Sequence, residues 1–121
     1  MKVPFLFFCK SYREDFDRLS ILVQSFEKYN FDKLKLVISI PELDFSSFKI
    51  PIGEYVTLIS DESYAKNHIT NEDYLDKKAG YINQEICKLT FFKKGLTNNY
   101  FCLDSDAQFI RPFYFTDFMY N

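Results

Sequence analysis

The chain has 121 residues, of which 47% are hydrophobic and 26% are charged, a composition typical of one folded domain rather than of a disordered, collagen-like or coiled-coil chain. Its 15 Lys and Arg against 17 Asp and Glu give a net charge of -2, which excludes the basic footprint that nucleic-acid binding requires. Three glycines leave no glycine-rich phosphate loop, and no apolar run approaches the roughly 18 residues of a membrane span. We therefore expect a single domain over residues 1–121 with no nucleic-acid partner.

A strand and a helix are expected at the start of the chain. Residues 3–10 form a continuous apolar run, which is typical of a strand buried on both faces. Ser11 and Glu14 have the spacing of a capping box. Apolar residues then recur at helical spacing over 16–26, so we expect a helix that ends by Asn30.

Two further strands follow, at residues 34–40 and 55–60, each rich in β-branched and other apolar residues. The polar stretch 61–78 predicts a connecting segment with at most a short helix capped by Thr70, and His68, the only histidine, is expected to be solvated there. Strand, helix, strand, strand is the opening of an α/β fold, and we expect a mostly parallel, open sheet flanked by helices.

The second clear helix is expected over residues 80–94, with Gly95 as its C-terminal cap. Its apolar face would consist of Ile82, Ile86, Leu89 and Leu96, and a second face would present Tyr81, Gln84, Lys88 and Phe91. Residues 100–103 predict a fourth strand, and the apolar residues over 107–110 predict another extended segment after it.

The cysteines indicate the redox environment of the protein. Cys9, Cys87 and Cys102 are odd in number, have no CxxC spacing, and each lies in an apolar segment. This pattern predicts reduced thiols in the core of a cytosolic protein rather than a disulfide framework or a zinc site.

The strongest chemical signal is Asp104-Ser105-Asp106, directly after the fourth strand. Two residues apart in extended chain, the two carboxylates would emerge on the same side. Open α/β sheets bind their ligands at the carboxyl ends of the strands. Paired carboxylates at that place suit Mg²⁺ or Mn²⁺ with open positions for substrate phosphates.

Other interpretations of this motif can be compared on the sequence. A calcium-binding EF-hand loop is excluded, because Phe109 and Phe115 stand where that loop needs Gly and Glu. A phosphohydrolase with an aspartyl nucleophile stays open, although such proteins carry the motif on their first strand and Gln108 departs from their pattern. A plain Asp-Ser-Asp turn, whose side chains cap local amides, also stays open.

Residues 80–113 resemble the central segment of bacterial glycosyltransferases of the GT-A fold, in particular those of polysaccharide and lipopolysaccharide biosynthesis. The matching positions are Tyr81, Gln84, Lys88-Leu89, Leu103 to Asp106, and Arg111-Pro112-Phe113. The N-terminal half agrees more loosely, through a first strand that ends in Lys10-Ser11-Tyr12 and an Ile-Ser-Ile-Pro strand.

This resemblance implies the Rossmann-like, nucleotide-binding half of a GT-A fold. Asp104 and Asp106 would hold Mn²⁺ or Mg²⁺ on the diphosphate of a uridine- or cytidine-type nucleotide sugar, and a saccharide would be the acceptor. The other implied contacts to the nucleotide and donor are Lys10, Ser11, Tyr12, Ser60, Asp61, Gln84 and Lys88. A helix cap for Ser11 and a solvated helix face for Gln84 and Lys88 remain alternatives. The implied location is cytoplasmic, beside the inner membrane.

The chain is shorter than the members of this family, which usually continue well beyond the metal motif to build the acceptor site and supply the catalytic base. We therefore expect a chain that is truncated relative to a full transferase, and no base can be named. The alternative is a non-catalytic fragment of such an enzyme that binds a nucleotide or oligomerises, the latter through an exposed aromatic patch. That patch would consist of Phe113, Phe115, Phe118, Met119 and Tyr120.

Overall fold

The computed structural model of the chain describes residues 2–65 and 79–119. His68, the short helix expected near Thr70, the side chains of Tyr81 and Ile82, and Tyr120 lie outside that description. Among the helices of the described residues, none has the length and hydropathy of a membrane span.

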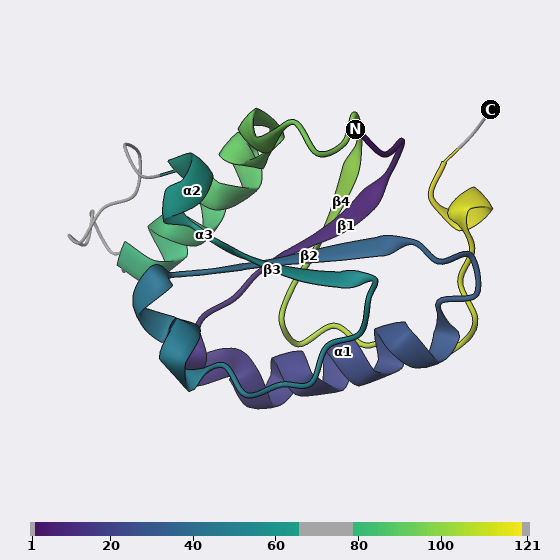
Figure 1. Cartoon of the computed structure of the whole chain (residues 1–121), viewed down its shortest axis with the longest axis horizontal. Helices are drawn as coiled ribbons and strands as arrows, with labels where there is room; N and C mark the ends of the chain where they lie inside the picture. The colour runs from purple at the N-terminus through teal and green to yellow at the C-terminus, as the bar shows by residue number, and fades with distance from the viewer. Residues whose placement is uncertain (1, 66–78, 120–121) are drawn as a thin grey trace.

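A four-stranded, all-parallel sheet forms the centre of the fold (Figure 1), which confirms the predicted α/β class. The strands are β1 (Leu6–Lys10), β2 (Lys35–Ile40), β3 (Val56–Ser60) and β4 (Tyr100–Leu103), in the spatial order β3-β2-β1-β4. Cys9 of β1 pairs with Ile38 on one side and Leu103 on the other, so the carboxyl ends of the strands lie level at one edge.

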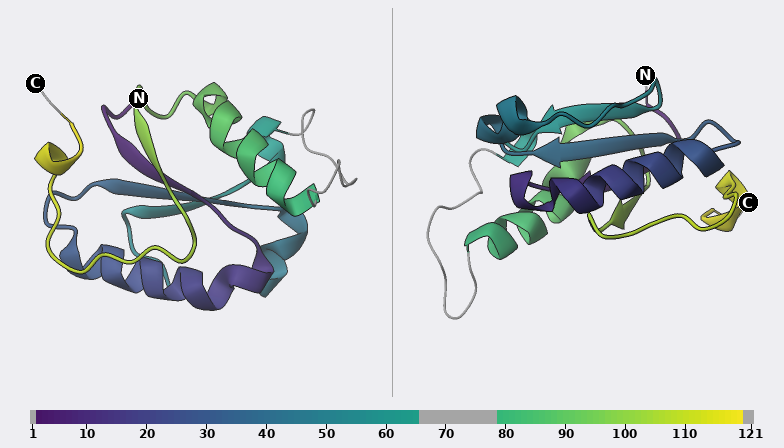
Figure 2. Two further views of the ribbon diagram at one scale, coloured as in Figure 1. Left: turned by 180° about the vertical axis from the view of Figure 1, so that it is seen from behind. Right: turned by 90° about the horizontal axis from the view of Figure 1, so that it is seen from below.

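One face of the sheet is covered by α1 (Phe16–Tyr29), which lies along it in both orientations of Figure 2. Phe7 and Cys9 point to this face and pack in a core with Leu19, Leu22, Val23 and Phe26 of the helix. Side chains alternate along a strand, so β1 contributes every second residue to this layer.

The opposite face is covered by α2 (Glu62–Ala65) and α3 (Ala79–Thr90), as Figure 1 shows. Leu6 and Phe8 of β1 pack there with Tyr64, Ala65, Cys87 and Phe91. A central strand between two helical layers buries both of its faces, which explains the unbroken apolar run at the start of the chain.

The end of α3 agrees with the prediction. The helix tightens into a 3-10 turn over Phe91–Lys94 and stops at Gly95, whose φ of 68° lies in the left-handed region that favours glycine. On the helix, however, Leu89 is 73% exposed and does not belong to the apolar face that was predicted. Cys87 and Phe91, one turn apart, form the inward face, and Leu89 lies on the opposite side of the helix.

Two further local predictions are wrong. The Ser11–Glu14 capping box does not form: α1 begins at Phe16, after a 3-10 turn over Arg13–Asp15, and its first turn has no side-chain cap. Ser11 is instead buried and bonded across the sheet edge. Cys102 is exposed, because β4 is the edge strand, whereas Cys9 and Cys87 are buried as predicted.

Residues 107–110 form no strand. After β4 the chain turns and runs beside α1 (Figure 2), where the Phe109 amide donates to Ser25 Oγ at 2.9 Å. The ring of Phe109 stacks on Phe113 with centroids 4.1 Å apart. The apolar spacing therefore reports the partial burial of Ala107 and Phe109 on the α1 side, whereas Ile110 is 81% exposed.

The expected aromatic patch is also wrong for its described members. Phe113 is 4% exposed, and Phe115, Phe118 and Met119 are half-buried against the α1-side core. Phe118 makes an edge-to-face contact with Phe7 at a centroid distance of 4.9 Å. This segment therefore closes the core of its own chain. Oligomerisation stays a prediction, but the exposed aromatic patch no longer supports it.

Candidate functional site

The carboxyl edge of the sheet contains the point where the strand order reverses. From β1 the chain proceeds outward through β2 and β3, and then returns to the other side of β1 as β4. In open α/β sheets this reversal opens a crevice beyond the strand ends, where ligands bind. The segments that follow β1 and β4 meet here: Ser105 Oγ donates a hydrogen bond to Ser11 Oγ at 2.8 Å, and both serines are buried.

Asp104-Ser105-Asp106 forms a β-turn at this crevice, closed by a hydrogen bond of 3.0 Å from the Ala107 amide to the Asp104 carbonyl. The expectation of an extended motif is therefore wrong. The turn directs Ser105 inward and leaves Asp104 and Asp106 exposed. Neither carboxylate accepts a hydrogen bond from a backbone amide within residues 2–65 and 79–119, so local capping does not account for this pair.

A cavity of about 300 Å³ lies over the turn. Its walls come from three parts of the chain, namely the first turns of α1, one side of α3, and the turn after β4. The lining residues are Asp15, Arg18, Gln84, Glu85, Lys88, Asp104, Ser105 and Asp106. Four carboxylates and two cationic side chains thus surround one small space, which makes it strongly polar.

Lys88 is the central cation of the cavity. Its Nζ lies 3.2 Å from Asp104 Oδ1 and 3.9 Å from Glu85 Oε1. Burial alone would lower the pKa of Lys88, but the hydrogen bond and charge of Asp104, with help from Glu85, raise that pKa above its ordinary value. The ammonium group therefore stays protonated and remains beside Asp104.

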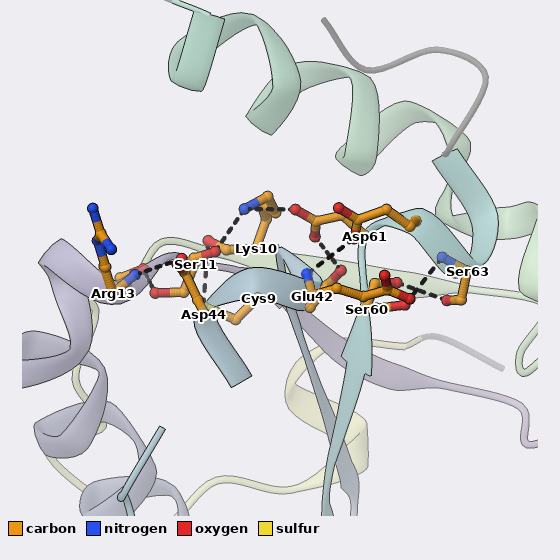
Figure 3. A network of polar contacts seen from close by, with 12 residues as sticks. Cys9, Lys10, Ser11, Arg13, Glu42, Asp44, Ser60, Asp61 and Ser63 are labelled. Carbon is orange, nitrogen blue, oxygen red and sulfur yellow. Dashed lines mark hydrogen bonds and ion pairs between the residues drawn. The ribbon is translucent and has the colours of Figure 1, made fainter. Parts of the chain in front are cut away.

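A second polar cluster lies on the α2–α3 side of the same sheet edge. This buried network consists of Lys10, Ser39, Asp61 and Tyr64, all at most 9% exposed. Lys10 Nζ is 3.1 Å from Asp61 Oδ2, an ion pair visible in Figure 3. Ser39 Oγ donates to Asp61 Oδ1 at 2.6 Å and lies 2.7 Å from the Tyr64 hydroxyl. The network joins the ends of β1, β2 and β3.

Burial dominates the electrostatics of this network. It raises the pKa of Asp61 above the ordinary value, although Lys10 and the Ser39 hydroxyl act in the opposite direction. It also raises the pKa of Tyr64 far above its ordinary value, and raises that of the neighbouring Cys87 thiol to about 11. Tyr64 and Cys87 are consequently neutral at physiological pH, and the ion pair is the only charged part of the described cluster.

The loops beside the network are fixed by their own contacts, which Figure 3 shows. Buried Asp44 accepts the Arg13 amide at 3.0 Å and so holds the segment that follows β1. Ser60 Oγ accepts the Ser63 amide at 3.1 Å at the start of α2. Both contacts are local anchors of the strand ends.

The residues predicted to bind the nucleotide and donor therefore fall into separate groups. Gln84, Lys88, Asp104 and Asp106 come together around the cavity. Lys10, Ser11 and Asp61 are buried and paired with other protein groups, and Ser60 bonds within its own turn. Tyr12 is 41% exposed on the loop after β1 and does not line the cavity.

Sequence reasoning missed several members of both clusters. Asp15 and Arg18 belong to a charged helix start that is equally typical of a solvated surface, and Glu85 precedes Lys88 by one helical turn. Ser39 and Tyr64 carried no sequence signal, since a serine in an apolar strand and a tyrosine in a polar stretch do not reveal that they meet.

The donor set of the cavity fits some metal sites and not others. Among the described residues, no three His, Cys, Asp or Glu side chains converge closely enough to hold a metal ion by themselves. Asp104 and Asp106 supply two carboxylates from one turn. That set suits Mg²⁺ or Mn²⁺, which take one or two protein carboxylates and complete their coordination with water and substrate phosphates.

Comparison with known proteins assigns the chain to a sequence family. Searches of curated proteins and of solved structures find no match. The model of the family described as "Family of unknown function (DUF6492)" matches residues 3–121, which is nearly the whole chain. The protein therefore belongs to the DUF6492 family.

Proposed function

We propose that this chain is the nucleotide-binding part of a GT-A-type glycosyltransferase, which binds a nucleoside-diphosphate sugar through a divalent cation on Asp104 and Asp106. One observation carries the proposal. The two carboxylates stand exposed in a turn directly after β4, beside the end of β1, where the strand order reverses and α/β sheets bind ligands.

The size of the cavity limits which part of the ligand it holds. About 300 Å³ is at the lower end of ligand-binding pockets, so it suits a diphosphate with its cation, while the base and sugar extend beyond it. When bound, the cation supplies Lewis acidity that stabilises the leaving nucleoside diphosphate. Lys88 and Gln84, on α3, face the diphosphate from the opposite wall.

Other residues act around this centre. Tyr12, exposed on the loop after β1, is available to stack on the base. The buried network of Lys10, Ser39, Asp61 and Tyr64 does not contact the ligand in this proposal; it holds the strand ends that support the loops. The acceptor is a surface polysaccharide or lipopolysaccharide, and the reaction takes place on the cytoplasmic side of the inner membrane.

Calorimetry with uridine and cytidine diphosphate sugars, each with and without Mn²⁺, tests the proposal. The wild-type chain is expected to bind one of them only when Mn²⁺ is present, and Asp104→Ala and Asp106→Ala are expected to weaken that binding at least about tenfold because each removes a charged ligand. Asp17→Ala, an exposed carboxylate on α1 outside the cavity, is the matched control and should bind normally.

Three results contradict the proposal: no binding of any nucleotide sugar, binding that does not depend on metal, and binding by either cavity variant that is as tight as in the wild-type chain. Metal-dependent binding without transfer to any saccharide acceptor would instead support the non-catalytic alternative.

A further inference from the structure

Lys88 contacts β4 through its backbone carbonyl and the turn after β4 through its ammonium. The Tyr100 hydroxyl donates a hydrogen bond of 2.7 Å to the Lys88 carbonyl, and four residues farther along the chain Asp104 holds the Lys88 ammonium at 3.2 Å. The side chain is only 22% exposed. The first contact fixes the α3 backbone beside β4, and the second holds the ammonium, which lysines on helix surfaces usually leave mobile, next to Asp104.

The same carboxylate would have to serve a metal ion. Asp104 Oδ1 accepts the Lys88 ammonium, whereas Asp106 makes no hydrogen bond or ion pair with the described residues. A divalent cation at this turn therefore meets one unpaired carboxylate and one that already carries a counter-ion. The ammonium on Asp104 Oδ1 repels a divalent cation on the same carboxylate, so metal binding is favoured when the ammonium leaves Asp104.

We propose that Lys88 is an internal counter-ion of Asp104 that couples binding of the divalent cation to binding of the diphosphate. The inference rests on the proposed function, because it concerns the same site. Without ligand, Lys88 neutralises Asp104 and holds off free metal. When the cation arrives with a diphosphate, the displaced ammonium has a phosphate oxygen as its new partner in the same cavity, where both remain charged. Each ligand therefore raises the affinity for the other by the same factor.

Titrations of Mn²⁺ in the absence and presence of uridine diphosphate measure this coupling. In the wild-type chain, uridine diphosphate is expected to tighten Mn²⁺ binding severalfold. In Lys88→Met, Mn²⁺ alone is expected to bind about fivefold tighter, since a partly exposed ion pair no longer competes with it. The enhancement by uridine diphosphate should shrink by a similar factor, because the displaced charge is missing.

Two matched variants separate this effect from general electrostatics. Lys88→Arg keeps the positive charge and should retain the weak binding of free Mn²⁺. Arg18→Met removes a positive charge from the same cavity, but that guanidinium pairs with Asp15 at 3.5 Å rather than with Asp104. It should change the Mn²⁺ affinity by less than about twofold. Circular dichroism checks folding, and Lys88→Gln replaces Lys88→Met should the latter fail to fold.

The possible outcomes distinguish this inference from the proposed function. If Mn²⁺ binds Lys88→Met no more tightly than wild type, or binds no variant, the inference is overturned. If nucleotide sugar binds with metal while Lys88→Met leaves both affinities unchanged, only the inference fails. If Mn²⁺ tightens in Lys88→Met but no nucleotide sugar binds any variant, the counter-ion role of Lys88 stands and the proposed function fails.

Discussion

Two polar clusters lie at the same edge of the sheet and differ in almost every physical respect. The buried network of Lys10, Ser39, Asp61 and Tyr64 is closed to solvent, and its ion pair and hydroxyls are satisfied by one another. The cavity beside the Asp104–Asp106 turn is open, and its side chains are charged and partly unpaired. Both clusters contain residues that were predicted to bind the nucleotide: Lys10 and Asp61 in the network, and Lys88 and Asp104 at the cavity.

The difference shows that position at a strand end does not by itself make a residue a ligand-binding residue. Burying a charge has a high cost, which Lys10 and Asp61 offset through each other, and displacing either by a ligand would leave the partner unpaired. Asp106, by contrast, has no such partner among the described residues. The first cluster is therefore suited to holding the fold, and the second to exchanging partners.

The largest expected effect comes from breaking the buried pair. Asp61→Ala leaves the Lys10 ammonium buried without its counter-ion and removes the carboxylate that accepts the Ser39 hydroxyl, so we expect the free energy of unfolding to fall by about 3–5 kcal/mol. Urea denaturation followed by circular dichroism measures it. The double variant Lys10→Met/Asp61→Leu should recover a large part of the loss. A loss below about 1 kcal/mol in Asp61→Ala would contradict the structural role of the network.

An intermediate effect is expected where the segments after β1 and β4 meet. Ser105→Ala removes the hydrogen bond to Ser11 Oγ and leaves that buried hydroxyl without its donor, which should lower the free energy of unfolding by about 1–2 kcal/mol. The same denaturation experiment applies, with exposed Ser46→Ala as the control, expected to be near neutral. Equal stability of the two variants would show that the Ser11–Ser105 contact does not stabilise the place where the segments after β1 and β4 meet.

The smallest effect on stability is expected in the open cavity. Asp106→Ala removes an exposed side chain that has no partner among the described residues, so the free energy of unfolding should change by at most about 0.5 kcal/mol. Thermal or urea unfolding measures this beside Asp61→Ala. A large loss of stability would mean that Asp106 is a structural residue, and the contrast between the two clusters would then fail.

Several features of the fold could be predicted from the sequence because their causes are local. The apolar run of β1, the helical periodicity of α1 and the left-handed glycine after α3 each report one element and its burial. The predicted segment at 107–110 failed for the converse reason. Ala107 and Phe109 are partly buried as their spacing indicates, but the partner is α1 and not a neighbouring strand, and Ile110 is exposed.

In the candidate site, too, only the local arrangement of residues was predictable from the sequence. Asp104 and Asp106 lie together because they belong to one turn, and Gln84 and Lys88 lie together because they are one helical turn apart. That these two pairs face each other, and that Lys88 contacts Asp104, depends on how α3 packs against β4. No spacing along the chain encodes that distance.

The sequence by itself determined the α/β class and the order of the strands and the two main helices, because hydrophobic periodicity acts over a few residues. Only the tertiary structure decided which polar strand-end residues are buried partners and which face the cavity. Lys10 and Asp61 are 51 positions apart, and Ser11 and Ser105 are 94 apart, yet each pair is in contact. Such pairings arise from the parallel sheet, which brings distant strand ends to one edge, where burial selects the charges that must be paired.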